Sequence, residues 1–247
     1  MTTAAGESAV PDAGPLNSFQ RLVGVLFSPI ETFRDIARRP DWIIPIIVIT
    51  LTTLASYMVV APHLDLESTF REQMEARGVT DQQLIDKQLE MMKKVTRFNA
   101  PITAIVIPLM MLAMAGVLLL AFKLMGYGGT FKQFFSVSSY SFVPQILKGI
   151  VTSIIVASRG MLTQPELVTL IKSNLGFLVE LKTSPAAFAF LSSFDVFNIW
   201  MVVLLIIGLS FAAKVTMRQS TVMVLILWSL MILIKVGIAA LTGGAGS

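Results

Sequence analysis

Five long apolar runs limit this chain more than any other feature of its sequence. They cover residues 42–61, 101–123, 137–157, 195–213 and 220–240. A helix needs roughly 20 apolar residues to cross a hydrocarbon core of about 30 Å, and each run has about that length. The sequence therefore predicts an all-α integral membrane protein, a five-transmembrane-helix bundle with short amphipathic interfacial helices.

The composition agrees with a membrane protein. Hydrophobic residues make up 55% of the chain and charged residues only 14%, which is unusual for a soluble domain. There is no cysteine and one histidine, His63, so disulfides and Cys/His metal sites are excluded. The net charge of +4 is explained by Lys and Arg beside the spans, and we expect no nucleic-acid partner. No signal peptide is visible before Trp42, so the first span is expected to act as an uncleaved insertion signal.

The segment before the first span has two parts. Residues 1–18 are predicted to be a disordered tail, and residues 19–41 two amphipathic cytoplasmic helices. The second helix is expected to begin with a capping box, Ser28-Pro29-Ile30-Glu31. This helix pair suits the headgroup plane of the bilayer, but packing on the bundle itself stays open. The candidate membrane-surface residues are Phe19, Leu22, Leu26, Phe27, Phe33, Arg34, Arg38 and Arg39.

The remaining connections are polar or short. Residues 62–99 carry six Lys/Arg and seven Asp/Glu and are predicted to form a helical insertion, either a hairpin or a bent helix. Its Leu/Met stripe could pack on the bundle, self-associate or bind a partner. Residues 158–194 are expected to be an interfacial segment, with a re-entrant element as the alternative. Residues 241–247 are expected to be a flexible tail, and the five-span membrane domain itself covers residues 42–240.

The third span has its own local signals. Thr130 to Gln133 is expected to cap the helix that leads into it, and Pro144 to bend it.

Five spans place the chain ends on opposite sides of the membrane. Lys214 and Arg218 flank a short turn, and the C-terminal tail carries no charge. By the excess of Lys and Arg in cytoplasmic loops, we expect a cytoplasmic N-terminus and an extracytoplasmic C-terminus in the inner membrane of a cell.

Polar groups within the spans are candidates for function, because an unpaired polar group in hydrocarbon costs several kcal/mol. One hypothesis pairs Lys148 with Asp195 across two helices. In the alternative, Lys148 reaches the interface and Asp195 only caps its own helix. Lys235 is expected to reach the interface as well. The candidate intramembrane polar cluster is Tyr140, Ser141, Gln145, Lys148, Asp195 and Asn198.

No catalytic or nucleotide-binding motif is present: G-x-S-x-G, H-E-x-x-H, the Walker loop and the dinucleotide turn are all missing. We therefore expect a protein that is not an enzyme, with no catalytic residue, no metal and no cofactor.

Three pairs of segments carry a resemblance to a known family. They are Leu26–Phe33 with Arg39–Pro40, Gly128–Gln133 with Ser139–Pro144, and Phe194–Trp200 with Gly208–Leu209. In this order, over about residues 19–240, they resemble bacterial members of the Yip domain family. The resemblance implies five spans. It also implies kinship to eukaryotic proteins of the secretory pathway that associate with Rab-type GTPases and shape or sort membranes. Residues 62–99 are an addition to the minimal family pattern.

The sequence thus predicts a non-catalytic multi-pass membrane protein, a scaffold or accessory subunit that organises membrane partners or lipid. Its expected partners are the lipid bilayer and other membrane proteins or further copies of itself. The alternatives are a small transporter or channel, and a lipid-handling, membrane-shaping protein.

Overall fold

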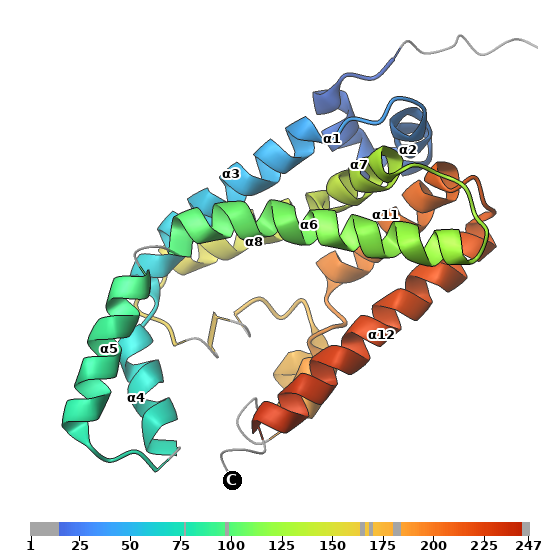
Figure 1. Cartoon of the computed structure of the whole chain (residues 1–247). Helices are drawn as coiled ribbons and strands as arrows, with labels where there is room; N and C mark the ends of the chain where they lie inside the picture. Colours follow the sequence, from blue (N-terminus) through green and yellow to red (C-terminus); the bar gives the residue numbers. More distant parts are fainter. Residues whose placement is uncertain are drawn as a thin grey trace, which may run out of the picture.

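The computed structural model describes residues 15–76, 78–96, 99–163, 166–167, 170–179 and 184–243. These residues form helices and loops, with no β-strand among them. In chain order the helices are α1 (Ser18–Phe27), α2 (Pro29–Arg38), α3 (Ile43–Val60), η1 (Ala61–His63), α4 (Leu66–Ala76), α5 (Gln82–Thr96), α6 (Asn99–Leu124), α7 (Phe131–Ser141), α8 (Val143–Ala157), η2 (Leu175–Leu178), α10 (Pro185–Leu191), α11 (Val196–Ala212) and α12 (Met217–Gly243) (Figure 1).

The expected tails fall largely outside the described residues, at 1–14 and 244–247. In the segment 158–194, which contains η2 and α10, residues 164–165, 168–169 and 180–183 lie outside them as well.

Four helical stretches are long and apolar enough to cross a membrane. They are Ile43–His63, Ile102–Leu124, Phe131–Ala157 and Met217–Thr242. The remaining predicted span is α11, which has 17 residues and is therefore about 25 Å long, at the lower limit for a spanning helix. The chain is an all-α, multi-pass membrane protein, as the sequence predicts.

The third span is divided. Its helix begins at Phe131, where Thr130 and Gln133 form the predicted capping box, and runs from there into the predicted span at 137–157. The division falls at Phe142, between α7 and α8, just before Pro144. Proline lacks the N–H that would continue the helical hydrogen bonds, which explains the break.

The second helix begins at the predicted residue but without the predicted capping box. Ser28 is the N-cap of α2 and Pro29 its first residue, but the Ser28 side chain makes no capping hydrogen bond. Instead the Ser28 carbonyl accepts hydrogen bonds from the N–H of Thr32 at 3.1 Å and from its hydroxyl at 2.8 Å. The expected capping box is therefore wrong at this position.

One end of the bundle is built from α1, α2, α7, the α6–α7 loop and the α11–α12 turn, and we call it the α1–α2 end (Figure 1). Phe33 of α2 is fully buried there against α7 and α11. A Cβ atom at Gly208 of α11 would overlap Val137 and lie 2.8 Å from Phe33 Cδ1. Glycine at this position is what allows α2, α7 and α11 to meet.

The glycine turn of the α6–α7 loop closes the same end. The N–H of Gly128 donates to the carbonyl of Ala213 over 3.2 Å, which joins this loop to the α11–α12 turn. Gly129 has φ = 100°, in the region that favours glycine, and a Cβ there would lie 2.6 Å from the Ala212 oxygen. All three pairs of segments that carry the family resemblance thus contribute residues to the α1–α2 end.

The opposite end, which we call the α4–α5 end, contains α4, α5, α10 and the segment 158–194. The helices α4 and α5 lie side by side and project away from the rest of the molecule (Figure 1). Between them Met74, Ile85 and Leu89 are buried. The predicted insertion at 62–99 is therefore a helical hairpin.

Candidate functional site

Two hydrogen-bonded side-chain pairs join α8 to α11 at membrane depth. The ammonium of Lys148 lies 3.1 Å from Asp195 Oδ2, and Gln145 Nε2 donates to Asn198 Oδ1 over 2.9 Å. The structure thus brings together four of the six residues of the predicted polar cluster. What these four do for function stays a prediction.

Asp195 uses both of its carboxylate oxygens. Oδ1 accepts hydrogen bonds from the N–H groups of Phe197 at 2.9 Å and Asn198 at 3.3 Å, and so caps α11. Oδ2 accepts from Lys148 and from the hydroxyl of Ser173. The side chain is only 1% exposed, so its charge depends on these partners. The two interpretations that the sequence left open, an ion pair and a helix cap, occur in the same residue.

The segment 158–194 completes the site, which the sequence did not indicate. Besides the Ser173 hydroxyl, the Ser173 carbonyl accepts from the N–H of Val196 over 3.0 Å. Lys235 of α12 donates to the hydroxyls of Ser192 at 3.1 Å and Ser193 at 3.2 Å. The serines at 173, 192 and 193 are three of many polar residues in this segment, so the sequence offered no signal that singles them out.

Tyr140 and Ser141 do not join this cluster. Both are fully buried in α7, and the Ser141 hydroxyl donates to the carbonyl of Val137, one turn earlier. Tyr140 faces α1, near Ser18 and Arg21, and belongs to the core of the α1–α2 end. The break between α7 and α8 turns these residues away from Lys148, so close spacing in sequence does not bring them together.

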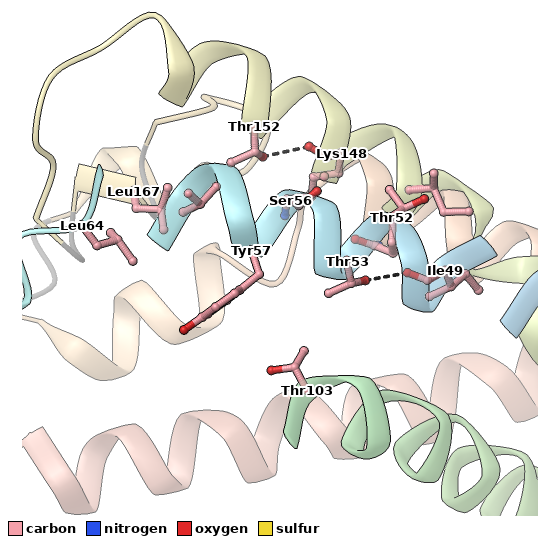
Figure 2. Close-up of a pocket in the computed structure, with 14 residues that line it drawn as sticks. Ile49, Thr52, Thr53, Ser56, Tyr57, Leu64, Thr103, Lys148, Thr152 and Leu167 are labelled. Atoms are coloured by element: carbon pink, nitrogen blue, oxygen red, sulfur yellow. Dashed lines mark hydrogen bonds between the residues drawn. The ribbon is translucent and has the colours of Figure 1, made fainter. Parts of the chain in front are cut away.

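A groove of about 460 Å³ lies beside the cluster, between α3, α8 and the start of α6 (Figure 2). Within the described part of the chain, Lys148 is the one charged residue that lines it. The hydroxyls of Thr53 and Thr152 donate to carbonyls of their own helices, both at 2.8 Å. These bonds reduce the hydrogen-bonding capacity that the groove offers to a solute. The threonine and serine side chains that line it are Thr52, Thr53, Ser56, Thr103 and Thr152.

The candidate membrane-surface residues divide between two environments. Leu22 and Phe33 are buried in the bundle, and Leu26 packs against its core. Phe19 and Phe27 are 72% and 80% exposed. The helix pair therefore packs on the bundle with one face and leaves aromatic side chains of α1 uncovered. The remaining candidates, Arg34, Arg38 and Arg39, are exposed.

A buried ion pair holds α1 against α2. Arg21 Nη2 lies 2.7 Å from Asp35 Oδ2, and Nη1 donates to the carbonyl of Arg39 over 3.0 Å. Arg21 is not among the residues that the sequence singled out. Its i+14 partner is on a different helix, so helical spacing gave no signal of the pair.

The cluster at α8 and α11 is suited to joining helices. Its side chains bond to one another across the two helices, and Asp195 accepts four hydrogen bonds. Within the part of the chain that the structure describes, no group of three or more His, Cys, Asp or Glu residues could hold a metal ion.

Comparison with known proteins gives one match. The family model described as the Yip1 domain matches residues 23–238. No curated protein and no solved structure matches the chain.

Proposed function

Because this chain belongs to the Yip1 domain family, we propose that it acts as a non-catalytic scaffold or accessory subunit that organises other membrane proteins or lipid around it. The observation that carries the proposal is the α4–α5 hairpin, which stands away from the bundle (Figure 1). Its inner face is already closed by Met74, Ile85 and Leu89. Leu84 and Met91 of α5 stay 42% and 60% exposed, and methionine is a side chain that adapts to varied partners.

Ion pairs hold the two helices of the hairpin together. Arg71 of α4 lies 2.8 Å from Asp86 and 3.2 Å from Glu67, and Lys93 lies 2.9 Å from Glu67. Each pair is exposed and contributes little alone. Together they link α4 to α5 at two places, Asp86 and Lys93. A preformed surface loses less conformational entropy when a partner binds.

The experiment is purification of the full chain in mild detergent at native abundance, followed by identification of co-purifying membrane proteins. We expect a stoichiometric partner that is lost in a variant with Leu84→Glu and Met91→Glu. The matched control is Gln82→Glu with Gln83→Glu, which adds the same charge to exposed positions of α5 and should keep the partner. A monodisperse single copy with no partner would count against the scaffold role.

The same proposal includes an orientation. The basic residues of the α1–α2 end outnumber Glu31, Asp35 and Asp41, the acidic residues there, and this favours a cytoplasmic location in an inner membrane. With α11 as a fifth crossing, the C-terminus lies on the other side. Reporter fusions at both termini test this, and activity from one compartment at both ends would contradict it. The basic residues are Arg21, Arg34, Arg38, Arg39, Lys123, Lys132, Lys214 and Arg218.

A lipid-handling role is the second candidate. The exposed Phe19 and Phe27 of α1, with Ile30 of α2 half exposed, favour it, because an exposed apolar face beside a membrane helix enters the headgroup layer. Transport through the groove of Figure 2 is the third, and Lys148 is its only charged lining residue. Solute flux into liposomes that contain the purified chain would support transport, and its absence would remove it.

A further inference from the structure

A basic hollow of about 490 Å³ lies at the α1–α2 end, apart from the cluster at α8 and α11. Three cations line it: Arg34 and Arg38 from α2, and Lys214 from the α11–α12 turn. Among the residues that the structure describes, no carboxylate lines it, and the other lining residues are Ala37, Gln133 and Phe211. Three like charges thus converge from two distant parts of the sequence.

The three cations are not neutralised by the protein. Among the ion pairs of the described residues, none includes Arg34, Arg38 or Lys214. The nearest acid in sequence, Asp35, is already paired with Arg21 on the other side of α2. The three side chains are exposed, so water weakens their mutual repulsion, and a bound anion would remove what remains of it.

The walls of the hollow are held by contacts of α2 with α7 and α11. Gln133 Nε2 donates to the carbonyl of Ala37 over 2.8 Å, which fastens α2 to α7. The Arg34 guanidinium lies over the Phe211 ring, 5.5 Å from its centroid, which orients its N–H groups. Lys214 has φ = 57°, a left-handed conformation that non-glycine residues rarely adopt, at the point where the chain leaves α11.

We propose that this hollow binds a phosphate group, with Arg34, Arg38 and Lys214 as its ligands. Guanidinium groups bind phosphate through two parallel hydrogen bonds, and a lysine adds a point charge. Lys214 follows α11 directly, so the hollow lies at the level where a membrane helix ends and phospholipid headgroups begin. Two sources supply this chemistry there: the headgroup of an anionic phospholipid, and free phosphate. The inference does not depend on the scaffold role.

The test uses the full chain, delipidated in detergent and titrated with phosphatidylglycerol or with inorganic phosphate. Lipid binding is read by native mass spectrometry and phosphate binding by the shift in thermal unfolding. The variant Arg34→Gln, Arg38→Gln, Lys214→Gln removes the three ligands. The matched control Arg39→Gln, Lys123→Gln, Arg218→Gln removes three exposed charges of the same end that do not line the hollow.

We expect roughly tenfold weaker binding of phosphatidylglycerol in the first variant and little change in the control. If only the stabilisation by inorganic phosphate is lost, the site takes free phosphate. Arg34→Lys keeps the charge but loses the planar fork, and should bind at an intermediate strength. Equal binding of both ligands by the first variant and the control would overturn the proposal. Size-exclusion elution and helical circular dichroism of each variant establish that it is folded.

Discussion

At the α1–α2 end, Phe33 lies against Gly208 and Val137 with no room for another carbon atom, whereas the other end of α11 is joined to α8 by the ion pair between Lys148 and Asp195. The difference follows from the side chains at each end of α11. Only apolar side chains crowd Gly208, whereas serines of the segment 158–194 reach Asp195 and Lys235. Close packing fixes a geometry that charges alone would leave adjustable.

Both ends contain residues of the family resemblance. Leu26–Phe33, Gly128–Gln133 and Gly208 belong to the α1–α2 end, whereas Phe194–Trp200 contains Asp195. The family match spans residues 23–238 and therefore includes the α4–α5 hairpin.

The largest loss of stability is expected at the α1–α2 end. Phe33→Ala removes a fully buried ring and should lower the free energy of unfolding by about 3–5 kcal/mol. Phe27→Ala, at an 80% exposed position, is the control and should change it by less than about 0.5 kcal/mol. Unfolding in detergent, followed by circular dichroism, measures both. Similar effects at the two positions would show that α2 does not pack as described.

A smaller loss of stability is expected at the ion pair between α8 and the start of α11. Asp195→Asn removes the charge that Lys148 faces, and we expect a cost of about 2–3 kcal/mol, less than for a fully buried pair because Lys148 is 33% exposed. Lys148→Met leaves a buried carboxylate without its cation. The double variant should cost less than the sum of the two.

Additive costs would mean that Asp195 acts only as the cap of α11. Lys87→Met, at an exposed position of α5, is the control for removal of a lysine charge.

Two glycines of the α6–α7 loop allow the cost of a positive φ to be measured apart from the cost of crowding. Gly129→Ala requires φ near 100° and brings a Cβ within 2.6 Å of the Ala212 oxygen, while Gly126→Ala meets open space at φ = 78°. We expect Gly129→Ala to be the more destabilising by about 1–2 kcal/mol. Thermal unfolding of both variants measures the difference. Equal losses of stability would mean that only the positive φ is costly, and would contradict the close contact between Gly129 and Ala212.

The smallest effect concerns pH at the α4–α5 hairpin. Hydrogen bonds from Lys93, and then from Arg71, lower the pKa of Glu67 from its ordinary value of 4.5. A carboxyl with a lowered pKa stabilises the folded state above its ordinary pKa, and this contribution is lost as the pH falls through the lowered pKa. Amide hydrogen exchange in α5, corrected for its intrinsic pH dependence, should therefore rise below pH 4.5, while α7 stays protected.

Glu67→Gln should abolish this pH dependence. If the dependence persists in that variant, another group is responsible for it.

The sequence was sufficient to predict those features that depend on composition alone. Apolar runs predicted the spans, and the pair of Lys148 and Asp195 was one of two interpretations, because few opposite charges occur at membrane depth. It was insufficient where a loop or a turn brings distant residues together. Ser173 reaches Asp195, and Lys214 reaches Arg34, only through the tertiary arrangement. Local rules also need context, since Thr130 forms its predicted capping box whereas Ser28 does not.

Asp195 has a consequence for biogenesis. A 17-residue helix that begins with a carboxylate is a poor candidate for independent transfer from the translocon into lipid. Ribosomal synthesis delivers α8 before α11, so Lys148 is already in place when the carboxylate emerges. We therefore expect α11 to partition into the bilayer alongside α8, late in the insertion of the chain.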